Sequence, residues 1–290
     1  MSTSMVPSIT VIIACRNAAN TLWLQLEALA AQTYEGRWEV IVSDNGSTDS
    51  SRAVAERFRS RLPELRIIDS SRTPGAGPAR NAAAAYAQYD YLAFCDADDE
   101  VTPTWLSAIS TALTENDFIA GRFETLKLNS PRTRRSRALQ QQSGLQESPF
   151  GPGLPHAGAG NMALRRDVFQ SVGGFDPSVG TLEDTDLCWR IQKAGKKLTF
   201  VPQAIVHVRL RTSLTGIWLQ GLGYGRAYTL LEQRYGANTP TSEAVPASRS
   251  IGSRFLKLLR ATQHPEALLW KIGWHVGHRT AKVLTPSART

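Results

Sequence analysis

The strongest constraint on the fold is a regular alternation of short apolar strands and helices over the first hundred residues. Strands are predicted at 8–14, 38–43, 65–69 and 91–95, and helical segments lie between them. Residues 8–14 are β-branched and apolar on both faces, which is typical of a strand covered on both sides. We expect Asn20 to cap the first helix. This order predicts an α/β fold with a mostly parallel sheet and right-handed crossovers.

Polar turns follow three of these strands, at 14–17, 43–49 and 96–99. Ligands of open parallel sheets bind beyond the carboxyl ends of the strands, so we expect the three turns to share one crevice. Asp96 and Asp98 point to the same side of an extended chain, and two such carboxylates suit Mg²⁺ or Mn²⁺ with diphosphate oxygens. The alternative is a solvated turn whose acids cap the next helix.

Six short motifs follow one another in a fixed order between residues 8 and 212. They are Ser8-Ile-Thr-Val-Ile-Ile-Ala-Cys-Arg-Asn17, Ile41-Val-Ser-Asp-Asn-Gly-Ser-Thr-Asp49, Gly77-Pro-Ala-Arg-Asn81, Phe94-Cys-Asp-Ala-Asp-Asp99, Gly160-Asn-Met-Ala-Leu-Arg-Arg166 with Gly173-Gly-Phe-Asp176, and Glu183-Asp-Thr-Asp-Leu-Cys-Trp-Arg190 ending at His207. Each motif alone is weak. Together they resemble the motifs of family 2 glycosyltransferases.

The resemblance implies a GT-A fold, which is Rossmann-like with a mostly parallel central sheet flanked by helices. It implies transfer of a sugar, with inversion, from a nucleotide-diphosphate donor such as a UDP-sugar to a hydroxyl acceptor, with Mn²⁺ or Mg²⁺ as cofactor. Carried over by position, the nucleotide-sugar contacts are Ala14, Arg16, Asp44, Arg80, Asp96, Ala97 and Asn161. The implied metal ligands are Asp98, Asp96 and His207, with Asp99 as an additional metal or water contact.

The sequence departs from the family pattern at the end of the pocket that binds the base. Many relatives have Pro-x-Tyr-Asn where this chain has Ala14-Cys15-Arg16-Asn17, and many have paired acids where it has Ser43-Asp44. The identity of the nucleotide base therefore stays open. The turn 44–49 has a second interpretation as a plain capped turn, because Asp, Asn, Gly and Ser all favour turns.

A second acidic run, Glu183-Asp184-Thr185-Asp186, opens a predicted helix at 183–194. Inverting transfer needs a carboxylate that takes the proton of the acceptor hydroxyl. The resemblance indicates Asp184 as this base and Glu183 as a neighbour that orients the base or the acceptor. The alternative is structural, since Thr181 and Asp184 read as a capping-box variant. His207 likewise has a structural alternative, because it follows an apolar strand.

The last part of the chain changes in character. We expect 1–212 to form a GT-A catalytic domain, 129–150 to be a mobile loop that touches the acceptor, and 213–290 to form a helical, basic C-terminal extension. In 251–284, basic residues alternate with aromatic and aliphatic ones. This segment either lies on an anionic membrane surface, as a peripheral contact, or packs on the catalytic domain.

Charge and composition set the remaining expectations. The net charge of +8 favours anionic partners, but no nucleic-acid-reading motif is present, so we expect no nucleic-acid partner. No signal peptide or run of ~18–20 apolar residues is found, so we expect a cytoplasmic protein, with peripheral binding to the inner face of the membrane left open. The resemblance implies an acceptor that is a glycan or is lipid-linked, as in cell-envelope polysaccharide synthesis. The alternative function is an inactive module that binds nucleotide sugar or glycan.

Overall fold

The computed structural model describes residues 6–136, 140–236 and 265–284. The chain divides into two compact units. The first comprises Met1–Leu128, Leu139–Glu147 and Leu154–Arg209, and the second comprises Asn129–Ala138, Ser148–Gly153 and Leu210–Thr290. Residues 251–264 of the predicted membrane-contact segment lie outside the described residues.

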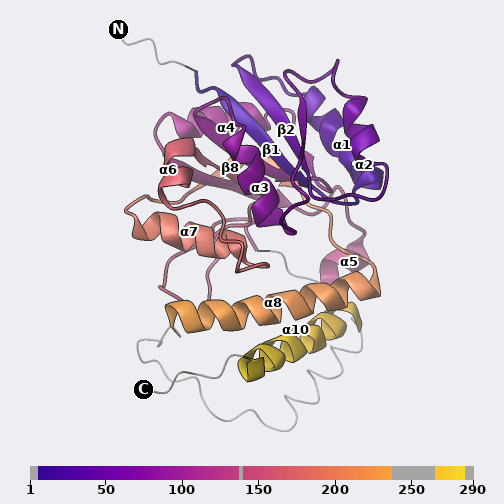
Figure 1. The fold of residues 1–290 in the computed structure, drawn as a ribbon, viewed down its shortest axis with the longest axis vertical. Helices are drawn as coiled ribbons and strands as arrows, with labels where there is room; N and C mark the ends of the chain where they lie inside the picture. Colours follow the sequence, from indigo (N-terminus) through magenta and orange to yellow (C-terminus); the bar gives the residue numbers. More distant parts are fainter. Residues whose placement is uncertain (1–5, 137–139, 237–264, 285–290) are drawn as a thin grey trace. The chain divides into compact units, whose positions relative to one another are not determined.

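The first unit is built on one eight-stranded mixed sheet (Figure 1) with the strand order β3-β2-β1-β4-β7-β6-β8-β5. Strand β1 pairs in parallel with β2 and β4, β2 with β3, and β6 with β8, whereas β7 runs antiparallel between β4 and β6. The strands are β1 (Ile9–Cys15), β2 (Trp38–Asp44), β3 (Arg66–Asp69), β4 (Tyr91–Asp96), β5 (Glu100–Val101), β6 (Phe118–Glu124), β7 (Asn161–Arg165) and β8 (Thr199–His207). The predicted α/β class is confirmed.

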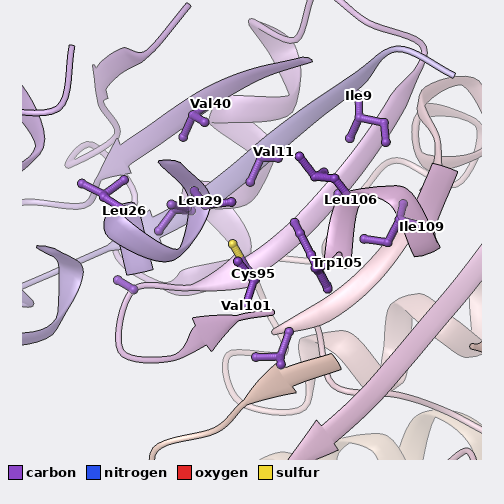
Figure 2. Close-up of a cluster of buried hydrophobic side chains, with 14 of the residues drawn as sticks. Ile9, Val11, Leu26, Leu29, Val40, Cys95, Val101, Trp105, Leu106 and Ile109 are labelled. Carbon is purple, nitrogen blue, oxygen red and sulfur yellow. The ribbon is translucent and has the colours of Figure 1, made fainter. Parts of the chain in front are cut away.

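Helices cover both faces of this sheet. Alternate residues of β1 explain why: Val11 and Ile13 enter one apolar cluster, and Ile12 enters the other. The first cluster (Figure 2) includes α1 (Ala19–Ala30), α2 (Ser51–Glu56) and α4 (Trp105–Leu113); the second includes α3 (Ala76–Ala85), α6 (Arg166–Ser171) and α7 (Glu183–Lys193). Each fully buried aliphatic side chain contributes about 1.5–3 kcal/mol to the stability of this core.

The first helix begins differently from the expectation. Helix α1 starts at Ala19, so Asn20 lies within it and is not its cap. The N–H group of Ala19 instead donates to Asp49 Oδ2 (3.0 Å), and that of Ala18 donates to Ser51 Oγ (2.8 Å). Side chains of the turn after β2 therefore complete the start of α1, which ties together the turns at the ends of two adjacent strands.

The segment 129–150, predicted as a mobile loop, contains a helix. Helix α5 (Pro131–Ser136) lies within it, and the backbone of Gln146 exchanges hydrogen bonds with that of His156 (2.8 and 2.9 Å). The two extended pieces predicted near 197–202 and 204–208 form the single strand β8. The Gly/Pro content of the region indicated its irregularity but not these pairings.

The second unit contains two long helices that run side by side, α8 (Leu214–Tyr235) and α10 (Pro265–Leu284) (Figure 1). Glycines bring their backbones close: a Cβ on Gly225 would lie 2.0 Å from the Trp274 carbonyl oxygen, and one on Gly277 would lie 2.1 Å from that of Leu222. Tyr228 and Trp274 pack edge-to-face across the pair. None of the helices in the described ranges has the length and hydropathy needed to span a bilayer.

Candidate functional site

The carboxyl ends of β1, β2 and β4 meet at one edge of the sheet. In the register of these strands, Ala14 lies opposite Ser43 on one side and Asp96 on the other, and Cys15 lies opposite Asp44. Parallel pairing thus brings the predicted nucleotide residues Ala14, Asp44 and Asp96 together, as expected of turns at such an edge.

Side-chain bonds hold the first two turns in place. Asn17, at a positive φ of 52°, accepts the N–H of Thr48 on its Oδ1 (2.7 Å). Asp44 Oδ1 accepts the N–H of Ser47 (3.0 Å) and is half-buried, while Arg16 is exposed beside them. The guanidinium of Arg16 can therefore reach a ligand at this edge without any loss of packing.

Asn45 was not singled out from the sequence, yet it organises the neighbouring loop. Its buried amide donates to the carbonyl groups of Ser70 (2.6 Å) and Thr73 (3.0 Å) and accepts the N–H of Gly75 (2.8 Å). The loop before α3 is thereby fixed against the end of β2. The only signal for Asn45 in the sequence was its position next to Asp44 in a polar turn.

Three carboxylates gather just beyond β4. One oxygen each of Asp96, Asp98 and Asp99 lie within 4.8 Å of one another, so this group can hold a metal ion. Burial, and then the charges of Asp98 and Asp96, raise the pKa of Asp99 well above its ordinary value. Like charges held this close are stabilised by a hard cation, so the donor set fits Mg²⁺ or Mn²⁺.

Gln25 on α1 clamps this acidic run. Its buried side chain donates to the Asp96 carbonyl oxygen (3.1 Å) and accepts the N–H of Val101 (3.0 Å), so one amide spans both ends of the turn. The backbone N–H of Arg209 also holds this run, because it donates to Asp99 Oδ1 (2.8 Å). Gln25 was missed in the sequence, although a lone amide between Leu22 and Leu26 on an apolar face is a detectable signal.

Arg80 joins the two acidic runs of the chain. Its guanidinium donates to Asp96 Oδ1 (2.7 Å) and to Glu183 Oε1 (2.9 Å), and it lies over the ring of Phe175. Burial opposes its charge, but Asp96 and Glu183 outweigh burial and raise the pKa of Arg80. The resemblance indicated that Arg80 contacts the donor. In the structure its guanidinium bonds two carboxylates of the protein itself, those of Asp96 and Glu183, which lie 16 and 103 residues away in the chain.

The second acidic run begins α7. Burial, and next the charge of Asp184, raise the pKa of Glu183 to about 7 against the effect of Arg80. Asp184 accepts the N–H groups of Thr185 (2.7 Å) and Ala159 (3.2 Å), which fixes its carboxylate. The predicted capping box is not formed, because the cap position is Leu182 in a left-handed conformation and makes no side-chain bond.

The segment 158–160 passes between the two acidic runs. A Cβ on Gly160 would lie 2.6 Å from Asp96 Oδ2, and one on Gly158 would lie 3.8 Å from Asp184 Oδ2. At Gly160 the Asp96 carboxylate leaves no room for a side chain, whereas at Gly158 the crowding comes from the Phe123 ring, 3.0 Å from the position of a Cβ. Gly160 lets the main chain lie against Asp96, and the N–H group of Ala159 bonds Asp184.

A buried histidine lies behind the predicted base. His156 Nδ1 is 3.2 Å from the Thr185 hydroxyl oxygen, which is 3.4 Å from Asp184 Oδ1. Burial lowers the pKa of His156 despite the nearby charge of Asp184, which favours the neutral imidazole. No sequence pattern pointed to this histidine, because its Gly/Pro-rich surroundings carry no periodicity.

Asn161 holds strands together. Its side chain is buried, accepts from Trp105 Nε1 (2.9 Å) and donates to the carbonyl oxygens of Arg122 and Ala204 (2.9 Å each). These three bonds tie the Asn161 side chain to α4, β6 and the strand β8, and the donor contact that the resemblance implies for Asn161 stays a prediction. Ala97 is buried within the acidic turn.

His207 ends β8, and its Nδ1 is 2.6 Å from Glu124 Oε2 at the end of β6. Burial acts against this carboxylate, but the bond to His207 and two backbone N–H groups lower the pKa of Glu124. The ring nitrogen left for a ligand is Nε2. The cluster that can hold an ion comprises the three aspartates and does not include His207.

Comparison with known families agrees with this arrangement. Residues 10–173, more than half of the chain, match the profile described as "Glycosyl transferase family 2". The chain belongs to glycosyl transferase family 2. The family predicted from the six motifs is thereby confirmed.

Family 2 relatives and folds of known structure are similar over most of the chain. "Glycosyltransferase AglE" of Haloferax volcanii is 30% identical over 206 residues, which cover 70% of this chain and 67% of the relative. The "Pre-mycofactocin glycosyltransferase" of Mycobacterium tuberculosis is 29% identical over 238 residues, which cover 78% of this chain. The chain spans about half the length (48%) of that relative.

Among solved structures, the mannosyltransferase PcManGT of Pyrobaculum calidifontis, in complex with GDP-Man and Mn²⁺, has a TM-score of 0.59. The match covers 98% of this chain and 76% of that one at 17% identity, which is a likeness of fold. The predicted GT-A fold is confirmed.

Proposed function

We propose that this family 2 protein transfers a sugar from a nucleotide-diphosphate donor to an acceptor hydroxyl with inversion. The observation that carries the proposal is the shared partner of the two acidic runs, since the Arg80 guanidinium bonds both Asp96 and Glu183. A donor held at the first run would have its reacting carbon close to the second, which is the positioning that a displacement needs.

The first acidic run, residues 96–99, supports a metal-assisted donor site. Asp98 and Asp96, with Asp99 behind them, form a carboxylate group suited to Mn²⁺ or Mg²⁺, and His207 Nε2 is a further candidate ligand. A bound cation would offset the charge of the diphosphate leaving group. We assign the nucleoside end to Ala14, Arg16 and Asp44 at the ends of β1 and β2.

The second run supports a base. The carboxylate of Asp184 is oriented by two backbone N–H groups and stands beside Glu183, whose raised pKa keeps it partly protonated near pH 7. In the proposed step the acceptor oxygen bonds to the anomeric carbon, its proton passes to Asp184, and the nucleoside diphosphate leaves. Glu183 and Arg80 position this base.

The test is a thermal-shift screen of the protein against UDP- and GDP-sugars, with and without Mn²⁺ or Mg²⁺, followed by turnover assays. We expect a metal-dependent rise in Tm for one class of donor, growing with the logarithm of its concentration, and release of the nucleoside diphosphate. Binding without turnover, with Asp184→Asn silent, would instead indicate an inactive binding module. Absence of any binding would overturn the proposal.

A further inference from the structure

Up to residue 281, the exposed side of α10 carries only apolar and basic residues. Beyond Pro265 at its start, the exposed positions up to residue 281 are Leu268, Lys271, Ile272, His275, Val276 and Arg279. Their spacing of three and four residues places them on one continuous face of a helix. We call these six residues the outer face of α10.

The outer face divides lengthwise into two rows. Leu268, Ile272 and Val276 recur every four residues and are 37%, 45% and 37% exposed, which is unusual for three aligned aliphatic side chains on a protein surface. Lys271, His275 and Arg279 recur at the same spacing and lie beside them. An apolar row beside a basic row is the pattern of helices that lie in a lipid interface.

The opposite side of α10 is already used. Gly273 and Gly277 pack against the backbone of α8, and Trp270 stacks edge-to-face with Tyr224. Glu266, the single acid in the sequence 265–284, pairs with Arg132 (2.9 Å). The α8–α10 contact therefore holds the helix in place while leaving the outer face exposed and free of acids.

We propose that the outer face of α10 docks on the surface of an anionic phospholipid bilayer. The apolar row would enter the boundary of the acyl chains, and Lys271 and Arg279 of the basic row would contact lipid phosphates. A second copy of this chain fits less well, because pairing two such faces would oppose like charges.

Vesicle flotation of the full chain, without donor or metal, tests this proposal apart from catalysis. We expect the protein to float with vesicles containing phosphatidylglycerol, to bind pure phosphatidylcholine far less, and to dissociate as salt is raised. Lys271→Glu with Arg279→Glu should lower partitioning about tenfold or more, since each cation strengthens binding to an anionic surface. Ile272→Asp should lower it similarly, because it removes the centre of the apolar row.

Two matched controls distinguish the face from net charge and from surface hydrophobicity. Arg37→Glu with Arg57→Glu makes the same change in net charge at exposed residues of the first unit, and Leu126→Asp removes an exposed leucine there. Both should float like the wild type within about twofold. All of these residues are exposed, so melting curves should show folded variants.

The proposal would be overturned if the α10 charge variant and the control charge variant lost vesicle binding equally. It would also be overturned if the α10 variants lost no vesicle binding. A stable dimer that Ile272→Asp dissociates would overturn it too, because it would assign the face to a second copy. Thermal shifts with donor and Mn²⁺, measured on the same variants, report the donor site separately.

Discussion

The acidic edge of the first unit and the α8–α10 pair of the second both depend on glycines, but for different purposes. At the edge, a Cβ on Gly160 would lie 2.6 Å from a carboxylate oxygen of Asp96. In the helix pair, a Cβ on Gly225 would lie 2.0 Å from the Trp274 carbonyl oxygen. The first glycine places main chain against a functional group, whereas the second allows two backbones to pack.

The two regions also treat charge in opposite ways. The Arg80 guanidinium at the acidic edge is buried and bonded to two carboxylates, whereas Lys271 and Arg279 of α10 are exposed. Buried, bonded groups set the geometry of a reaction, and exposed ones set what a surface attracts. Changes at the edge should therefore affect chemistry first, and changes in the helix pair should affect stability or docking first.

The largest expected effect is on the metal-binding side of the edge. Asp98→Asn should abolish the Mn²⁺-dependent stabilisation by donor and lower turnover about 100-fold or more, because the cation loses a ligand. Removing the metal with a chelator should do the same to the wild type. Asp167→Asn, at an exposed acid bonded to Arg165, is the control and should match the wild type. Unchanged metal dependence in Asp98→Asn would contradict the assignment.

Gly225→Ala should break the helix pair and spare the edge. The new methyl group would overlap backbone atoms of α10, which cannot move away as a flexible side chain could. We therefore expect the free energy of unfolding to fall by about 1–3 kcal/mol, despite the higher helix propensity of alanine. Donor binding should persist. Gly144→Ala is the control, because a Cβ there meets no atom within 4 Å. A stable Gly225→Ala variant would show that the backbones are not in contact.

Gln25→Leu tests whether the clamp supports the acidic turn. The substitution leaves the Asp96 carbonyl and the Val101 N–H without this partner, which costs about 1–2 kcal/mol in urea unfolding and weakens donor binding. Gln170→Leu, at an exposed position of α6, should change neither quantity. If Gln25→Leu weakens donor binding no more than Gln170→Leu does, the turn keeps its shape without the clamp.

The fourth prediction is a pH dependence, which changes stability and leaves the donor site intact. Because the pKa of Glu183 is raised from 4.5 to about 7, the stability that its protonated form contributes is complete below about pH 4.5 and is lost as the pH rises through about 7. The stability of the wild type relative to Glu183→Gln should therefore fall by about 3 kcal/mol across this range. A difference that stays constant with pH would show that Glu183 is not perturbed.

Much of the edge was predictable because its signals are local. Short runs of β-branched residues followed by polar turns predict β1, β2 and β4, and parallel pairing then aligns Ala14, Asp44 and Asp96. The acidic cluster follows from its position after β4. Residue type and place in a strand–turn unit were sufficient for these features.

The rest depends on tertiary contacts that no local pattern reports. The bond from Arg80 to Glu183 joins residues 103 positions apart, and the architectural role of Asn161 depends on β7 entering the sheet antiparallel to β4. The clash expected at Gly225 likewise appears only once α8 and α10 are paired. The sequence predicted a helical extension there but not the contact between its two helices.

The most direct test of the central claim, that two acidic runs form one catalytic site, is to measure donor affinity and turnover together in Asp184→Asn. With Mn²⁺ present, the account predicts a donor Kd within about threefold of the wild-type value, because the first run is intact, and turnover lower by about 10²–10⁴-fold, because the base is lost. Wild-type turnover in this variant, or loss of donor binding together with turnover, would contradict the account.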